Sequence, residues 1–221
     1  MLQNRFCTTV VLLVLCIAAG GSLAAQVASD SDLAAITERG RMLYAYDQAA
    51  WHASDAVQAT HPPKESMGDY IAQKTPDGWQ VAFGRLNEKG DAFLVSVMAV
   101  QGRQPEQFSV MQMETPQRDT GFYLTAAKGI QAALKEFQGA NRKYNVAVLP
   151  ATGEQVYVYL LPAPTDQDPA QLGADARFLV SAEGAIVERR RLHKSLIPHG
   201  QAPPGATLAG GTHTHVLTDS P

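Results

Sequence analysis

The sequence predicts an α+β fold, in which a mostly antiparallel sheet of about six to eight strands, a meander plus hairpins, is covered by a long N-terminal helix and a central helix. Apolar residues recur at three- and four-residue steps in residues 29–59 and 120–139, as they do on one face of a helix. Between and after these segments, apolar and polar residues alternate with the two-residue period of strands. Runs of strands separated by single helices favour α+β over a parallel α/β fold.

The central helix is the clearest element of the pattern. Asp119 or Thr120 is suited to cap its first amides, and Gly139 is suited to end it. We expect its apolar stripe to pack on the sheet, with Ile130, Leu134 and Phe137 at the contact. The stripe consists of Tyr123, Ala126, Ala127, Ile130, Ala133, Leu134 and Phe137.

Residues 1–25 have the organisation of a secretory signal peptide. Arg5 precedes an unbroken apolar run at residues 10–19, and small residues follow near Ala25. The run is too short for a membrane anchor, so we expect cleavage and no stable membrane insertion afterwards. The mature protein is then extracytoplasmic, either periplasmic or secreted. Both cysteines, Cys7 and Cys16, lie within this segment, which leaves the mature chain without a disulfide.

The composition of the chain limits the classes of partner that the protein is expected to bind. The chain has 18 basic and 21 acidic residues, a net charge of −3, and its one basic run is Arg189 to Arg191. Alternation along a strand divides that run between two faces, so we interpret it as solvated surface. The mild acidity excludes nucleic acid as a partner and leaves a small molecule or a protein. Residues 26–200 are long enough for a single α+β domain.

The N-terminal helix is predicted from Ser29 to about Ala59, with Ser29 or Ser31 as the N-cap and the prolines after His61 as the stop. At 100° per residue, a set of mostly apolar residues shares one side, and Asp47 falls in the middle of it. The set is Leu33, Ile36, Gly40, Leu43, Ala50, Trp51 and Val57.

A carboxylate among apolar residues is either structural or part of a site. Asp47 is flanked by Tyr44 and Trp51, and His52 lies a quarter-turn away. These four residues are therefore the candidates for a ligand groove beneath the N-terminal helix. A structural role for Asp47 and His52 is the competing interpretation.

Strand pairs are predicted where alternation flanks turn residues. The charged last strand is expected to be an edge. The expected strands are 70–75, 79–86, 92–100, 108–114, 144–149, 155–161, 176–181 and 185–193.

Residues 201–221 form a Pro- and Gly-rich tail that ends in a His-x-His segment. On a strand, His213 and His215 point to the same face, which lets two imidazoles bind one Zn²⁺. A catalytic site needs a third ligand, for which Asp219, His193 and His199 are the candidates. The segment resembles the His-x-His of the JAMM/MPN metallohydrolases. The Ser-x-x-Asp segment of that family is not found after it, so the activity is not carried over.

Two functions follow from these observations. The favoured one is an exported, non-catalytic module that binds a ligand or partner in a groove between the sheet and the N-terminal helix, and requires no cofactor. The alternative is a zinc-dependent hydrolase that uses His213 and His215. No Gly-x-Ser-x-Gly motif is present, and a mature chain without cysteine excludes a thiol nucleophile. Whether the protein is an enzyme is left open by the sequence.

Overall fold

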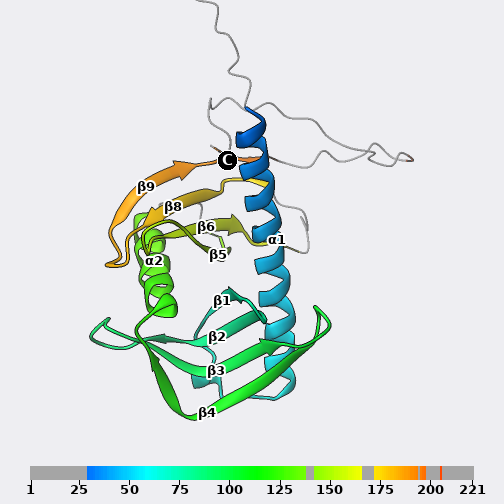
Figure 1. The fold of residues 1–221 in the computed structure, drawn as a ribbon, viewed down its shortest axis with the longest axis vertical. Coiled ribbons are helices and arrows are strands. Elements are labelled where there is room, and N and C mark those ends of the chain that lie inside the picture. Colours follow the sequence, from blue (N-terminus) through cyan, green and yellow to red (C-terminus); the bar gives the residue numbers. More distant parts are fainter. Residues whose placement is uncertain (1–28, 138–141, 166–171, 194, 198–204, 206–221) are drawn as a thin grey trace, which may run out of the picture.

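The fold belongs to the predicted α+β class. The computed structural model describes residues 29–137, 142–165, 172–193, 195–197 and 205 (Figure 1). The described residues form two α-helices and two four-stranded antiparallel sheets, with a small two-stranded pairing beside the second sheet. The predicted strands are therefore divided between two sheets. The expected signal peptide and the His-x-His tail lie outside the described residues.

Each helix is followed in the chain by a four-stranded sheet. The first sheet has the order β1-β2-β3-β4 and the second the order β5-β6-β8-β9. The first unit comprises α1 (Asp30–Ala59), a short 3₁₀ helix (Lys64–Ser66), β1 (Asp69–Thr75), β2 (Gly78–Leu86), β3 (Phe93–Gln101) and β4 (Phe108–Asp119). The second comprises α2 (Phe122–Glu136), β5 (Tyr144–Pro150), β6 (Val156–Pro162), β8 (Ala176–Val180) and β9 (Ile186–Arg191). The small pairing joins β7 (Leu172–Gly173) to β10 (Leu196–Ile197).

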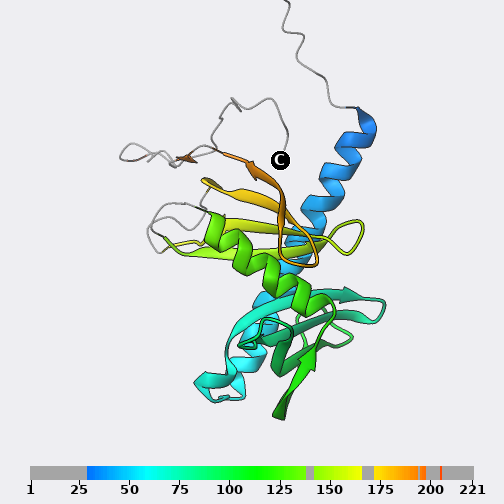
Figure 2. The same ribbon diagram turned by 90° about the vertical axis from the view of Figure 1, so that its left-hand side faces the viewer.

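Helix α1 begins at a capping box. The Ser29 side chain accepts a hydrogen bond from the Asp32 amide, and the Asp32 carboxylate accepts one from the Ser29 amide. With 30 residues, the helix is about 45 Å long and contacts strands of both sheets, as Figures 1 and 2 show.

The buried face of α1 is rotated from the side that periodicity predicted. Leu33 and Trp51 are 52% and 57% exposed, whereas the face in the core carries mainly small residues. Alanines at these positions let the helix lie close to the strands, and this close approach decides which side is buried. The buried residues are Tyr46, Ala49, Ala50, Ala53 and Val57.

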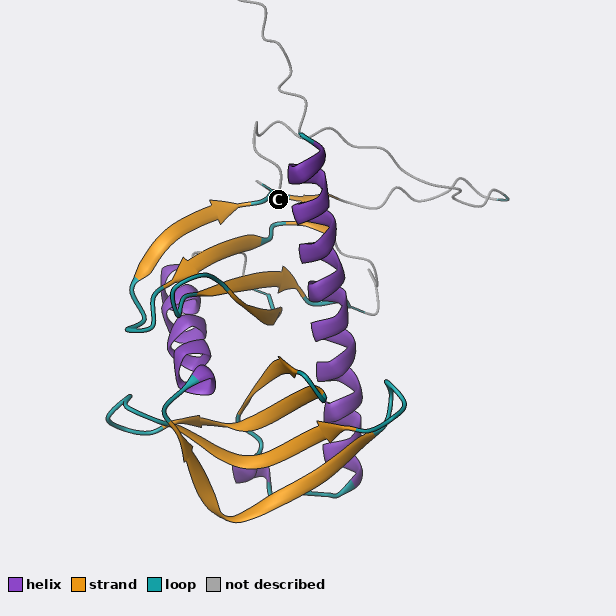
Figure 3. Ribbon diagram, in the orientation of Figure 1, coloured by secondary structure: helices purple, strands orange, loops and turns teal. Residues whose placement is uncertain are grey.

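Helix α2 lies across from α1, and the two helices flank the region between the sheets (Figure 3). Asp119 caps it as expected, because its Oδ1 accepts hydrogen bonds from the amides of Gly121 and Leu124, each at 3.1 Å. Ile130 is buried and Phe137 is half-buried, but Leu134 is 48% exposed, so that part of the predicted stripe is wrong. Leu134 therefore lies at the solvent edge of the stripe. The predicted terminator Gly139 lies outside the described residues.

The core joins the two sheets through α1 and α2. Tyr46 of α1 packs edge-on against Trp79 of β2, with ring centroids 6.1 Å apart. The Tyr70 hydroxyl of β1 donates a hydrogen bond to the Val146 carbonyl of β5 at 3.4 Å. The first contact joins α1 to the first sheet, and the second joins the first sheet to the second.

Candidate functional site

A hollow of about 530 Å³ lies between the C-terminal half of α1 and the connection from β3 to β4. Like the groove expected from the sequence, it borders the N-terminal helix, but of the four predicted groove residues only His52 lines it. A volume of this size is within the range of small-molecule sites. Its lining consists of His52, Asp55, Ala56, Gly102, Glu106, Gln107, Phe108 and Ser109.

One wall of this hollow is the β3–β4 loop, and two hydrogen bonds of the Gln101 side chain hold this loop in place. Its Oε1 accepts from the Trp79 amide at 3.1 Å, and its Nε2 donates to the Pro105 carbonyl at 2.8 Å. The Gly102 amide also donates to the Gln107 carbonyl at 2.7 Å. One side chain thus ties the loop to the neighbouring strand, so the wall is formed before any ligand arrives.

A second bond fixes the helix against the strand that carries Phe108 and Ser109. The Gln112 Nε2 of β4 donates to Thr60 Oγ1, directly after α1, at 3.0 Å. On the helix wall, the His52 imidazole stacks on the Trp51 indole, with centroids 5.1 Å apart and planes 13° apart. This stacking limits the orientations of the imidazole at the edge of the hollow.

The chemistry of the lining is acidic. Asp55 and Glu106 face the hollow from opposite walls, and none of the described residues that line it is lysine or arginine. His52, Gln107 and Ser109 add hydrogen-bonding groups, and Phe108 adds an apolar surface. Carboxylates on two walls attract a cation, and the amide and hydroxyl groups can orient it.

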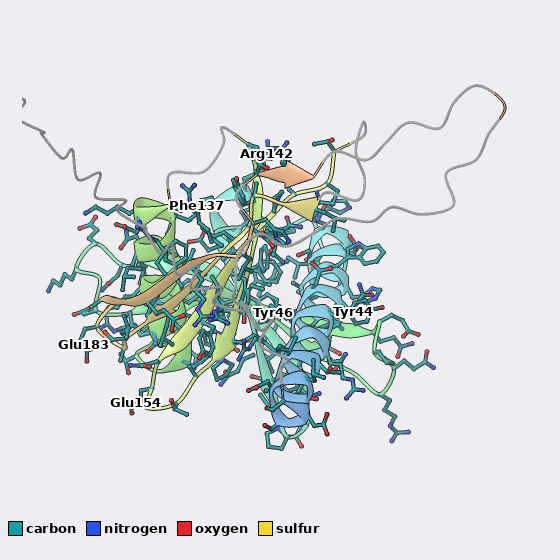
Figure 4. All side chains as sticks on the ribbon, turned by 90° about the horizontal axis from the view of Figure 1, so that it is seen from above. Tyr44, Tyr46, Phe137, Arg142, Glu154 and Glu183 are labelled. Carbon is teal, nitrogen blue, oxygen red and sulfur yellow. The ribbon has the colours of Figure 1, made fainter. Side chains whose placement is uncertain are left out.

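Of the four groove candidates on α1, the structure places His52 at the hollow. Tyr44 and Trp51 lie on the exposed face of the helix, 68% and 57% exposed, and Asp47 is exposed between them. In Figure 4, Tyr44 points away from the sheets, whereas Tyr46 points toward them. Although the Asp47 side chain is exposed, neighbouring protein atoms remove part of its hydration, and this partial desolvation raises the pKa of its carboxyl group. These three residues do not line the hollow.

Among the candidate metal ligands, only His193 lies within the described residues. Its Nδ1 lies 2.6 Å from Asp175 Oδ1, a hydrogen bond that orients the ring. The other candidates, His199, His213, His215 and Asp219, lie outside the described residues. Within the described ranges, no group of three or more His, Cys, Asp or Glu side chains is arranged to hold a metal ion.

A smaller hollow of about 390 Å³ lies at the first turn of α2. Its walls are Phe122 and Leu124 of the helix, Pro150 and Glu154 of the β5–β6 connection, and Ala182 after β8. The lining is mostly apolar and carries one ionisable side chain among the residues described. It offers fewer groups that could select a ligand than the hollow beside His52.

One cluster was not predicted from the sequence. Arg177 of β8 is only 6% exposed, and its Nη2 lies 3.1 Å from Glu188 Oε1 of β9. The Cζ atoms of Arg177 and of Arg39 in α1 lie 5.1 and 5.4 Å from the ring centroid of Tyr157. The sequence feature that could have indicated this cluster is the alternation of tyrosine with valine in β6, because it puts the tyrosines on one face of the strand. The run around Arg190 was interpreted as solvated surface, but Arg190 also pairs with Glu188, at 2.6 Å.

Comparison of the chain with protein-family models, with curated proteins and with solved structures finds no match. Among the described helices, none is both long and apolar enough to span a membrane. The functional argument therefore depends on the chemistry of this chain alone.

Proposed function

We propose that this protein is an exported, non-catalytic binding module that takes a small cationic ligand, such as an amine, in the hollow between α1 and the β3–β4 connection. The observation that carries the proposal is the pair of carboxylates, Asp55 and Glu106, on opposite walls of a hollow of about 530 Å³. A ligand with two amino groups could pair with both carboxylates at once. Each ion pair at a surface of this kind contributes about 1 kcal/mol, or about a fivefold change in affinity.

The construction of the walls supports binding rather than catalysis. Gln101 fixes the loop and the Gln112 to Thr60 bond fixes β4 to the end of α1, so the geometry is set in advance. Preorganised walls reduce the entropy lost on binding. The lining offers hydrogen-bond acceptors and an aromatic edge, which are groups that suit the binding of a cation.

Isothermal titration with 1,4-diaminobutane tests the proposal, with glutarate, a dianion of similar length, as the charge-reversed control. We expect the diamine to bind and glutarate not to bind. Asp55→Asn and Glu106→Gln should each weaken diamine binding by about fivefold, and the double variant by more. Asp77→Asn, in the exposed β1–β2 turn, is the matched control and should bind as the wild type does. Equal affinity in the wild type and the double variant would refute the proposal.

The zinc-dependent hydrolase is the alternative function, and it rests on His213 and His215. Metal analysis of the purified protein separates the two proposals, because a binding module for amines does not require zinc. A stoichiometric zinc content that is lost in a His213→Ala/His215→Ala variant would favour the hydrolase.

A further inference from the structure

A second cluster of charged and aromatic side chains lies on the second sheet, on the face that α2 does not cover. A Cβ atom added to Gly129 of α2 would lie 3.0 and 3.1 Å from the side chains of Val156 and Val158, so the valines of β6 face α2. The alternate residues, Tyr157 and Tyr159, therefore point to the opposite face. The N-terminal half of α1 contributes Arg39 there, with its guanidinium over the Tyr157 ring.

Strand register assembles the rest of the cluster. Arg177 of β8 is directly opposite Tyr159 of β6 and diagonal to Tyr157, so all three side chains share one face. The Tyr157 ring contacts two guanidinium groups, those of Arg39 and Arg177. Two positive charges beside the same ring repel each other, and an anion bound near them would relieve that repulsion.

Only part of this positive charge is balanced within the described residues. Arg177 forms an ion pair with Glu188, whose carboxylate also accepts from Arg190. Arg39 has no carboxylate within ion-pair distance in the described part of the chain, whereas Arg41, two residues further along α1, pairs with Glu38 at 3.8 Å. The side of the cluster nearest α1 therefore keeps an excess of positive charge.

A buried hydroxyl group completes the cluster. Tyr159 is 2% exposed, and no described residue accepts a hydrogen bond from its buried hydroxyl. Burial raises the pKa of Tyr159, whereas the positive charges of Arg39 and Arg177 and a hydrogen-bonding interaction with the Arg177 side chain oppose that shift, so both guanidinium groups act on this oxygen. A neutral phenol donates its O–H, and a buried donor without an acceptor is costly. An anion held by the guanidinium groups would supply that acceptor.

We infer that Arg39, Arg177, Tyr157 and Tyr159 form a binding site for an oxyanion, the carboxylate or phosphate group of a small ligand. Arg39 and Arg177 supply charge-assisted donors, the Tyr159 hydroxyl supplies a neutral donor, and the Tyr157 ring holds the two guanidinium groups in place. The site lies about 20 Å along α1 from the hollow beside His52. It is independent of the amine site proposed above.

Isothermal titration of the full-length protein with inorganic phosphate and with acetate, at matched ionic strength, tests the inference and distinguishes the two ligand classes. We expect at least one of them to bind with a dissociation constant below 10 mM, a threshold of about the order expected for a small ion with few contacts. Arg39→Ala should weaken that binding by about tenfold. Arg41→Ala, the matched control on the same helix, should leave it unchanged.

Tyr159→Phe separates a binding role from a structural one. It removes only the hydroxyl, so the variant should unfold at the same or a higher denaturant concentration, yet bind the anion about threefold or more weakly. Three outcomes would overturn the inference: no binding below 10 mM of either anion, an equal loss in the Arg39→Ala and Arg41→Ala variants, which indicates an adventitious ion only, or a Tyr159→Phe variant that binds as the wild type does.

Discussion

The phenol oxygen of Tyr46 in α1 lies 3.2 Å from the backbone nitrogen of Ala72 in β1 and accepts a hydrogen bond there, inside the core. Burial raises the pKa of Tyr46, and hydrogen bonds from the backbone of Ala72 and of Val148 oppose that shift. The oxygen therefore faces β1 of the first sheet and β5 of the second. This one side chain connects the helix that forms one wall of the hollow to both sheets.

Tyr46→Phe is expected to lower the free energy of unfolding by about 1–3 kcal/mol, because the buried Ala72 amide loses its acceptor. Tyr44→Phe removes the same hydroxyl from a side chain that is 68% exposed, and should change stability by less than about 0.5 kcal/mol. Urea unfolding of both variants checks this. Equal stability of the two variants would show that the Tyr46 bond contributes nothing.

The apolar stripe of α2 provides a second test. Ile130 is 6% exposed and Leu134 is 48% exposed. Ile130→Asp should destabilise the fold by about 3 kcal/mol or more, because it buries a charge, whereas Leu134→Asp should cost less than about 1 kcal/mol. Thermal melts compare the two directly. A larger loss in Leu134→Asp would place the helix in a different rotation from the one described.

Two helical glycines should respond in opposite ways to a side chain. Gly40 in α1 has nothing within 4 Å of an added Cβ, so Gly40→Ala should stabilise the protein by about 0.5–1 kcal/mol through helix propensity. At Gly129 the added Cβ already lies 3.0 Å from Val156, so Gly129→Val should destabilise by about 1–3 kcal/mol. Chemical denaturation measures both changes. A stabilised Gly129→Val variant would mean that α2 does not lie so close to β6.

The helices could be predicted from the sequence because their periodicity is local. The cap at Asp119 and the buried position of Ile130 depend on neighbours within a few residues, and both predictions are confirmed. The buried face of α1 was harder to predict, since the apolar residues of this helix are spread around its circumference. The alanines at 49, 50 and 53 are buried because they let the strands approach, while Trp51 lies outside this face and is exposed.

The division into two sheets and the arginine cluster could not be predicted, because both depend on long-range pairing. Local alternation predicts a strand but not its partner. The β6–β8 register places Arg177 opposite Tyr159. The path of α1 over the second sheet places Arg39 at the Tyr157 ring. Among the predicted site residues, His52 lines the hollow. Asp55, which was not among the predicted site residues, also lines the hollow, whereas Asp47 does not.

Asp47 gives a prediction about pH. Burial raises its pKa above the usual value of 3.8, so the folded state keeps the proton to a higher pH than the unfolded state does. The stability that this group contributes is present below the unfolded pKa and is lost as pH rises through the folded pKa. Asp47→Asn should therefore be more stable than the wild type at pH 7 and equal to it near pH 3. Urea unfolding at the two pH values checks this.

Asp77→Asn controls for the general loss of one negative charge from an acidic protein. If it stabilises the protein at pH 7 as much as Asp47→Asn does, the local surroundings of Asp47 are not the cause.

The most direct test of the proposed amine site is to map a diamine onto the protein by NMR. In ¹H–¹⁵N spectra, 1,4-diaminobutane should shift the amide signals of Gly102, Gln107, Ser109 and His52, all of which line the hollow. The shifts should saturate, and they should disappear in the Asp55→Asn/Glu106→Gln variant. Shifts that centre on another surface, or that rise in proportion to concentration without saturating, would contradict the proposal that this hollow is the ligand site.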